Sequence, residues 1–139
     1  MLERTFFMIK PDALSRGLTE EIKNRLIFAG IKISAEKELV MDLSQAEKLY
    51  AVHRAKEFYP GLIKLITSGP VVTLILEAEG AVAKVRKLIG ATDPREAAQG
   101  TIRGDLKEAN IFTEYGTMKN LVHGSDSPQN AEYESKIFF

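Results

Sequence analysis

Four stretches of the chain carry the hydrophobic pattern of β-strands. Residues 5–9 form a short continuous apolar run, which predicts a central strand buried on both faces of a sheet. Residues 71–76 give the strongest strand signal, because a Ser-Gly-Pro break precedes a run of apolar and β-branched residues. Residues 31–41 alternate in part, and residues 121–122 form an apolar pair before a glycine-containing turn. The pattern therefore predicts four strands.

Apolar residues recur at helical spacing between these strands. Residues 19–29 and 81–89 each present an apolar side, and a glycine follows each segment as a stop signal. Ser44 and Glu47 match a capping box, which predicts a helix that begins there and runs to about Arg54. The other predicted helical segments are residues 62–67, a short turn after Asp93-Pro94, and a closing helix over 128–138.

The order of these elements predicts the fold class. Strand, helix, strand, helices, strand, helix, strand and helix follow one another along the chain, which favours an α+β fold. We expect a ferredoxin-like, four-stranded antiparallel sheet covered by helices, with a doubly wound parallel sheet as the alternative. No repeat or linker interrupts the pattern, so residues 1–139 are interpreted as a single domain.

Composition narrows the range of partners and cofactors. Nineteen basic and nineteen acidic residues give a formal net charge of zero, so no excess of positive charge indicates a specific nucleic-acid partner. The chain has no cysteine and two histidines, which leaves too few ligands for a zinc site. No apolar stretch reaches the roughly 20 residues that span a bilayer, and the first residues lack a signal-peptide layout. We therefore expect a cytoplasmic protein without a membrane partner.

His123 is the most informative candidate for chemistry. It follows the predicted strand at 121–122, and Ser127-Pro128 is a helix start signal shortly after it. An imidazole near a helix N-terminus lies where negative charge is favoured, which suits a histidine that carries a phosphoryl group. A structural histidine is the alternative. His53, the other histidine, is interpreted as a surface or packing residue.

Several polar residues could surround a phosphorylated histidine. A phosphoryl transfer needs cations and donors around the phosphate oxygens, and the ring needs an orienting partner. Glu134 lies about two turns into the last helix and could orient the ring; a solvated glutamate is the alternative. The candidate phosphate ligands are Lys10, Arg86, Thr92 and Arg103, each of which could instead be a solvated or turn residue, with Asp105 as the alternative partner of Arg103. Neither the P-loop nor the G-x-G-x-x-G pattern occurs.

Five motifs in order resemble those of nucleoside diphosphate kinases. They are KPD at 10–12, FYPGL at 58–62, SGPVV at 68–72, GTIRGD at 100–105 and NLVHGSDS at 120–127. The resemblance extends from Glu3 to the end of the chain. It implies an enzyme that moves the terminal phosphoryl group of a nucleoside triphosphate to a nucleoside diphosphate, by a ping-pong mechanism through a phosphohistidine.

The resemblance also implies roles for individual residues. His123 would be the nucleophile, through the ring nitrogen nearer the Cβ, and Ser125 and Glu134 would position its ring. Tyr50 would lie beside the transferring group. The implied nucleotide ligands are Lys10, Phe58, Arg86, Thr92, Arg103 and Asn120, with Phe58 on the base and Asn120 with Lys10 on the ribose. Mg²⁺ would be bound by the phosphates of the nucleotide and by water, and Asp126 would contribute to its binding at most indirectly.

Two features depart from the family pattern. Residues 106–119 form a longer connection than the family pattern has, and Tyr115-Gly116 predicts a hairpin or loop within it. The chain also ends on Ile137-Phe138-Phe139, short of the tail many members have. Family members form homo-oligomers, hexamers or tetramers built from dimers, and both features bear on that assembly.

Two other functions remain open from the residues alone. A nucleotide-sensing module would keep the pocket without turnover, but it would need neither His123 nor Glu134. A histidine phosphocarrier would pass its group to another protein, and it would not need Phe58, Asn120 or the phosphate-holding arginines.

Overall fold

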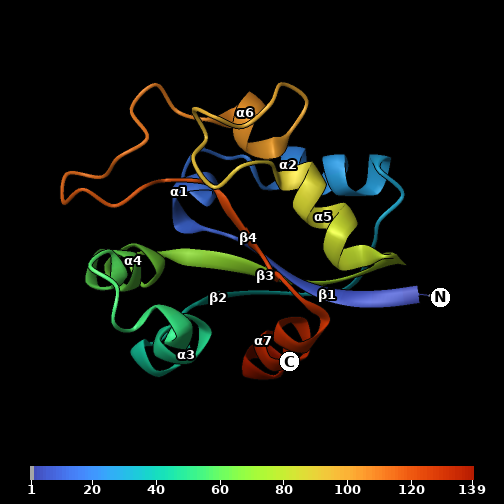
Figure 1. The fold of residues 1–139 in the computed structure, drawn as a ribbon, viewed down its shortest axis with the longest axis horizontal. Helices are drawn as coiled ribbons and strands as arrows, with labels where there is room; N and C mark the ends of the chain where they lie inside the picture. The colour runs from blue at the N-terminus through green and yellow to red at the C-terminus, as the bar shows by residue number, and fades with distance from the viewer. Residues whose placement is uncertain (1) are drawn as a thin grey trace.

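A four-stranded antiparallel sheet forms the centre of the computed structural model, which describes residues 2–139 (Figure 1). The strand order is β2-β3-β1-β4, and each neighbouring pair runs antiparallel. The strands are β1 (Leu2–Ile9), β2 (Lys32–Val40), β3 (Pro70–Glu79) and β4 (Val122–Gly124). The prediction of an α+β, ferredoxin-like fold is confirmed, and the parallel alternative is wrong.

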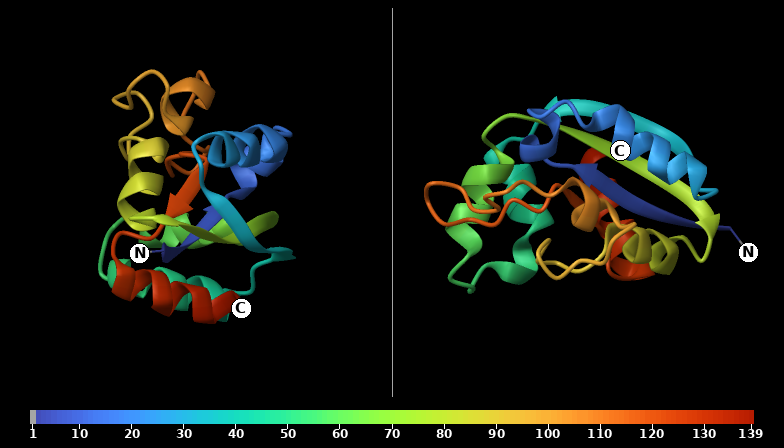
Figure 2. Two further views of the ribbon diagram at one scale, coloured as in Figure 1. Left: turned by 90° about the vertical axis from the view of Figure 1, so that its right-hand side faces the viewer. Right: turned by 90° about the horizontal axis from the view of Figure 1, so that it is seen from above.

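Helices cover both faces of this sheet (Figures 1 and 2). Phe7 and Ile9 of β1 pack in one core cluster, whereas Phe6 and Met8 pack in another, because successive side chains of a strand point to opposite faces. The first cluster includes residues of α2 (Thr19–Phe28), α5 (Ala81–Ile89) and α6 (Ile102–Leu106). The second includes residues of α3 (Leu43–Leu49), α4 (Tyr59–Ile66) and α7 (Pro128–Phe138). None of the helices within residues 2–139 is long and apolar enough to cross a membrane.

The main errors of the helix predictions lie in short elements. Helix α1 (Pro11–Leu14) and α6 have four and five residues, too short for hydrophobic periodicity to reveal. The turn predicted to be helical after Asp93-Pro94 contains no helix. Helix α4 begins at Tyr59, three residues before the predicted segment, with Pro60 in its first turn.

The predicted capping box of α3 was misplaced. Asp42, not Ser44, is the N-cap: its side chain accepts a hydrogen bond from the Gln45 backbone, and the Gln45 side chain accepts one from the Asp42 backbone. Both pairs fit the pattern of a capping box, since Asp serves as an N-cap as well as Ser. The helix also ends at Leu49, and a short 3-10 turn, η1 (Ala51–His53), follows it.

Candidate active site

One cavity of about 720 Å³ brings together the candidate residues of the sequence. Its walls come from the end of β1, the α3–α4 segment, α5, α6, β4 and α7. The candidate residues that line the cavity are Lys10, Tyr50, Phe58, Arg86, Thr92, Arg103, Asn120, His123, Asp126 and Glu134. The remaining candidate, Ser125, does not line the cavity but is hydrogen-bonded to Glu134. Residues distant in sequence thus share one site.

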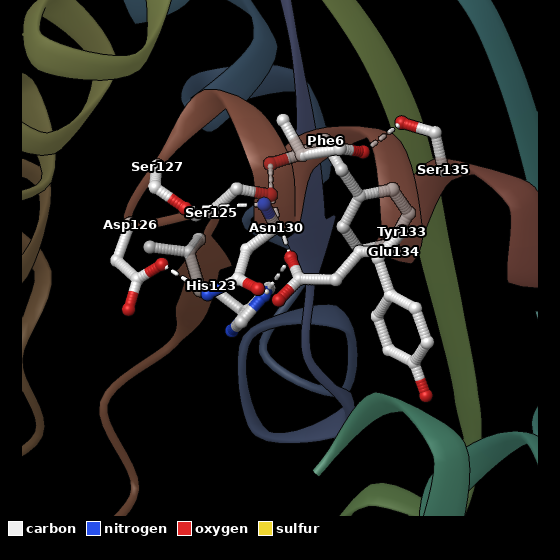
Figure 3. Close-up of polar contacts among 12 residues, drawn as sticks. Phe6, His123, Ser125, Asp126, Ser127, Asn130, Tyr133, Glu134 and Ser135 are labelled. Atoms are coloured by element: carbon white, nitrogen blue, oxygen red, sulfur yellow. Dashed lines mark hydrogen bonds and ion pairs between the residues drawn. The ribbon is translucent and has the colours of Figure 1, made fainter. Parts of the chain in front are cut away.

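The ring of His123 is held by Glu134 (Figure 3). Nε2 of His123 lies 2.8 Å from Oε1 of Glu134, and the hydroxyl of Ser125 donates to the same oxygen at 2.6 Å. Because an ionised carboxylate can only accept hydrogen bonds, we assign the proton of this contact to Nε2 of His123. Nδ1 then carries the lone pair, and no described residue forms a hydrogen bond with it.

The partners of this ring are buried. Glu134 is 7% exposed and Ser125 is 1% exposed, so their geometry is fixed by packing as well as by hydrogen bonds. Phe6 and Tyr50 contact the ring of His123, with ring centroids at 6.0 and 5.8 Å. Glu134 reaches back from α7 toward β4, as expected from the tilt of helical side chains toward the N-terminus.

A strained junction leads the chain into β4. Leu121 is fully buried and has φ = +75°, a conformation that a leucine rarely adopts. Its backbone N–H donates to Asp12 at 2.9 Å, and its carbonyl accepts from the backbone N–H of Lys10 at 2.9 Å. Such strain persists only where the surroundings over-determine it. The KPD segment therefore fixes the direction in which the chain enters the strand of His123.

Lys10 is a buried cation at the end of β1. It is 4% exposed, and its ammonium donates to the side-chain oxygen of Asn120 at 2.8 Å. Burial lowers the pKa of Lys10 to about 8, although nearby Asp12 opposes the shift. A buried ammonium without a full counter-charge favours an anionic ligand.

Arg103 binds the backbone on both sides of the Leu121 junction. Its guanidinium donates to the carbonyls of Asn120 at 3.0 Å and Val122 at 2.7 Å. Burial, and then the charge of Arg86, lower the pKa of Arg103 to about 10. Asp105, the alternative partner predicted for Arg103, instead forms an ion pair with Arg25 at 2.8 Å. Two like charges near each other indicate a site built for an anion.

Arg86 and Thr92 complete the polar side of the cavity. Arg86 is exposed on α5 and donates to the carbonyl of Gly124 at 3.4 Å. The backbone carbonyl of Thr92 accepts a hydrogen bond from the Asn120 side chain at 3.1 Å. Among the described residues, neither the guanidinium of Arg86 nor the hydroxyl of Thr92 forms a hydrogen bond or ion pair with a carboxylate, and the charge of Arg86 acts on Asp126 only from a distance, where it helps to lower the pKa of that carboxyl. Both therefore remain available to a ligand.

Aromatic side chains also line the cavity. Phe58, the N-cap residue of α4, is 53% exposed. The hydroxyl of Tyr50 is buried and has no hydrogen-bond partner among residues 2–139, and burial raises the pKa of that phenol. His53 lies between them, with ring centroids at 6.2 Å from Tyr50 and 5.2 Å from Phe58. His53 is thus a packing residue, as predicted, and it also lines the cavity, which its spacing of three residues from Tyr50 could have indicated.

The cavity contains few groups that favour a metal ion. Asp126 lines it and accepts a hydrogen bond from Asn130, which lowers the pKa of the Asp126 carboxyl. Within residues 2–139, no group of three or more His, Cys, Asp or Glu side chains is placed to hold a metal. The donor set of the cavity therefore fits phosphate oxygens better than a bare cation.

Comparison with known proteins gives the family of this chain. The family model for nucleoside diphosphate kinase matches residues 3–139. A nucleoside diphosphate kinase of Archaeoglobus fulgidus is 49% identical over 138 residues, which cover 99% of this chain and 87% of that protein.

Solved structures give the same result. The nucleoside diphosphate kinase of Aquifex aeolicus has a TM-score of 0.90 and 38% identity, and the match covers 100% of this chain and 96% of that one. The structure of the Borrelia burgdorferi nucleoside diphosphate kinase is a transition state mimic with bound vanadate and ADP. It has a TM-score of 0.90 and 36% identity, and the match covers 99% of this chain and 87% of that one. The chain therefore belongs to the nucleoside diphosphate kinase family, a family of phosphotransferases.

Proposed function

We propose that the protein transfers the terminal phosphoryl group from a nucleoside triphosphate to a nucleoside diphosphate through a phosphohistidine at His123. The observation that carries this proposal is the 2.8 Å contact between Nε2 of His123 and Oε1 of Glu134. Because Nε2–H is held by Glu134, the lone pair of the free Nδ1 is available for attack. The Borrelia relative with vanadate and ADP supports nucleotide phosphoryl transfer as the class of reaction.

The proposed reaction has two balanced halves. Nδ1 of His123 attacks the terminal phosphorus, the new N–P bond forms, and the bond to the bridging oxygen breaks, so the diphosphate leaves with the electron pair. A terminal oxygen of the second diphosphate then attacks the same phosphorus, and the N–P bond breaks. The Nε2 proton stays on the ring throughout, and the negative charge of Glu134 stabilises the phosphorylated imidazole. No proton leaves or enters the site in the sum.

Cations and donors in the cavity would hold the phosphates. Lys10, Arg86 and Arg103 would neutralise the phosphate oxygens, since catalysis of phosphoryl transfer is mostly positioning and electrostatic stabilisation. The unpartnered hydroxyl of Tyr50 and the hydroxyl of Thr92 would donate further hydrogen bonds. These donors are fixed before the substrate arrives, so little reorganisation is needed.

The other end of the nucleotide would lie toward α4. Phe58 would stack on the base, and stacking tolerates any base because each has a π-face. Asn120, already bonded to Lys10, would contact the ribose hydroxyl. One site could then serve several nucleoside diphosphates.

Mg²⁺ belongs to the proposal as a part of the substrate. It keeps much of its hydration and prefers nucleotide phosphates with one or two carboxylates. Asp126 lines the cavity and does not hold His123, so its oxygens would act on the hydrated ion indirectly. When bound with the nucleotide, the ion would neutralise phosphate charge.

Three predictions about the whole protein stay predictions. Residues 1–139 would form a single domain, and the protein would work as a homo-oligomer, a hexamer or a tetramer of dimers. We also expect a cytoplasmic location. Sedimentation of the pure protein, which gives its mass in solution, would test the assembly.

A labelling experiment tests the proposed function. The pure protein is incubated with terminally labelled ATP, then freed of nucleotide and given GDP. We expect an acid-labile label on the protein that moves to GTP. Label that does not move to GDP would indicate a phosphocarrier, and nucleotide binding without label would indicate a sensor.

The nucleophile is tested by one variant and one control. His123→Ala should abolish labelling, whereas His53→Ala, which removes the other imidazole of the cavity, should keep it. Circular dichroism should show both variants folded. Phosphate exchange by His123→Ala at the wild-type rate would show that His123 is not the nucleophile.

A further inference from the structure

The connection between α6 and β4 contains a β-hairpin at residues 111–119, referred to below as the hairpin. Phe112 pairs with Met118 in an antiparallel bridge, and the backbone N–H of Thr113 donates to the Thr117 carbonyl at 2.8 Å. Gly116 supplies the turn with φ = +84°, which a glycine adopts without strain. The hairpin is therefore an ordered feature with its own hydrogen bonds.

The hairpin lines the cavity of the candidate active site. Five consecutive or nearly consecutive residues contribute to its walls: Phe112, Tyr115, Gly116, Thr117 and Met118. Phe58 lines the same cavity. The longer connection thus adds a wall to the site rather than a detached surface loop.

The tip of the hairpin is seated on α4, as the orange segment beside α4 shows in Figures 1 and 2. The ammonium of Lys64 lies 4.2 Å from the ring centroid of Tyr115, a cation–π contact. Thr117 fills the space above Gly61 so closely that a Cβ at Gly61 would collide with its hydroxyl. The ring of Tyr115 also lies 3.8 Å from that Cβ position. Two independent contacts therefore join hairpin and helix.

The contact between the hairpin and α4 lies close in sequence to Phe58, and the hairpin is followed in the chain by the strand of His123. Gly61 is three residues after Phe58, so both lie on the same side of the first turn of α4. At its other end, the hairpin continues into Asn120 and the strand of His123. The hairpin therefore connects the exposed aromatic end of the cavity to its buried catalytic end.

We propose that Tyr115 is a positioning residue that anchors the hairpin on α4 and thereby fixes Phe58 for the base of the nucleotide. The inference rests on the proposed function of the site. It assigns the hairpin a role in nucleotide affinity and leaves the phosphoryl transfer step to the residues around His123. Without the anchor, α4 and the hairpin must be ordered by each incoming nucleotide.

Steady-state kinetics with GDP as acceptor test this role. Tyr115→Ala should raise the KM for GDP about two- to fivefold, the range of an exposed cation–π contact, while kcat stays within about twofold. Lys64→Met, which keeps most of the side chain but removes the charge, should raise KM similarly. Tyr115→Phe keeps the ring and should behave like the wild type.

Glu114→Ala is the matched control. Glu114 is exposed, adjoins Tyr115 at the tip of the hairpin and does not line the cavity. Its removal should change neither KM nor kcat. An equal rise in KM for this variant would indicate a general loosening of the hairpin and would overturn the role of Tyr115.

Hydrogen exchange of the nucleotide-free protein tests the anchor itself. Amides of α4 should exchange faster in Tyr115→Ala and Lys64→Met than in the wild type and Glu114→Ala. Unchanged exchange together with an unchanged KM would refute the proposal. Wild-type labelling by ATP in the same preparation keeps this outcome separate from a failure of the proposed function, which would remove the label altogether.

Discussion

The two ends of the cavity are built in different ways. At the phosphate end, Lys10, Asn120 and Glu134 are 4%, 9% and 7% exposed, and each is tied to another element by a hydrogen bond. At the base end, Phe58 is 53% exposed and Val52 is 75% exposed, and the wall consists of a helix start and a hairpin. The phosphate end is therefore held mostly by buried side chains, with Arg86 and Thr92 exposed at its rim, whereas the base end is mostly a surface assembly.

This difference follows the demands of the two tasks. A reacting phosphoryl group needs fixed donors at fixed distances, because misplacement by about 1 Å is costly to the rate. A base needs only a flat apolar face if many bases are to be accepted. Changes at the phosphate end should therefore act on kcat, and changes at the base end should act on KM.

The largest expected effect is that of Arg103→Met. The change removes a buried charge from the phosphates, two hydrogen bonds to the carbonyls on either side of Leu121 and one to the carbonyl of Gly90. We expect kcat to fall about 10²- to 10³-fold, as when a donor to developing negative charge is lost. Rapid-quench measurement of histidine labelling checks this, and Arg95→Met, an exposed arginine outside the cavity, is the control. A normal labelling rate in Arg103→Met would contradict the division between the two ends.

Glu134→Gln should have the next largest effect. The amide oxygen can still accept from Nε2 and Ser125, but the negative charge behind the ring is lost. Since hydrogen bonds to charged groups contribute about 1.5–3 kcal/mol and neutral ones about 0.5–1.5 kcal/mol, kcat should fall about tenfold. Pre-steady-state labelling by ATP measures the loss. If only KM changed, Glu134 would not act through the ring.

Phe58→Ala should act on KM rather than on kcat. Loss of a stacked aromatic side chain costs about 1–3 kcal/mol per base, so KM should rise about tenfold while kcat is kept. Initial rates with ADP, GDP and CDP measure this, and the rise should be similar for the three. A fall in kcat with constant KM would show that the base end takes part in the chemical step.

The smallest expected effect is a pH dependence from Lys10. Its folded pKa of about 8 means that its positive charge is present below pH 8 and is lost as the pH rises through that value. Unlike a substitution at the phosphate end, this titration should appear in kcat/KM rather than in kcat, because the phosphates of a bound nucleotide keep Lys10 charged and only the free enzyme loses the proton in this range. The charged fraction predicts that kcat/KM falls about twofold between pH 7 and pH 8. Lys10→Arg, which stays charged, should remove this step from the pH profile; an unchanged step would assign it to another group.

Local pattern in the sequence was sufficient for most of the framework. The buried runs in β1 and β3 and the apolar side of α5 predicted their elements, because the period of apolar residues reflects which faces are covered. The order of strands and helices then predicted the fold class. The five motifs in order, from KPD at 10–12 to NLVHGSDS at 120–127, predicted the family, which the comparisons confirm.

The short helices were not predicted from the sequence, and the reason is physical. Helices as short as α1 and α6 are not stable alone, so their existence depends on tertiary packing. The partner of Asp105 escaped for a similar reason, since Arg25 lies 80 residues away and no local pattern connects the two.

By itself, the sequence determined the sheet, most helices, the family and the set of polar residues to consider. Only the tertiary structure decided how they meet: the shared oxygen of Glu134, the strained Leu121 held by Asp12, His53 in the cavity wall and the hairpin seated on Gly61. The physical reason is that periodicity records burial within one element, whereas hydrogen-bond partners and close contacts depend on chain segments that are distant in sequence.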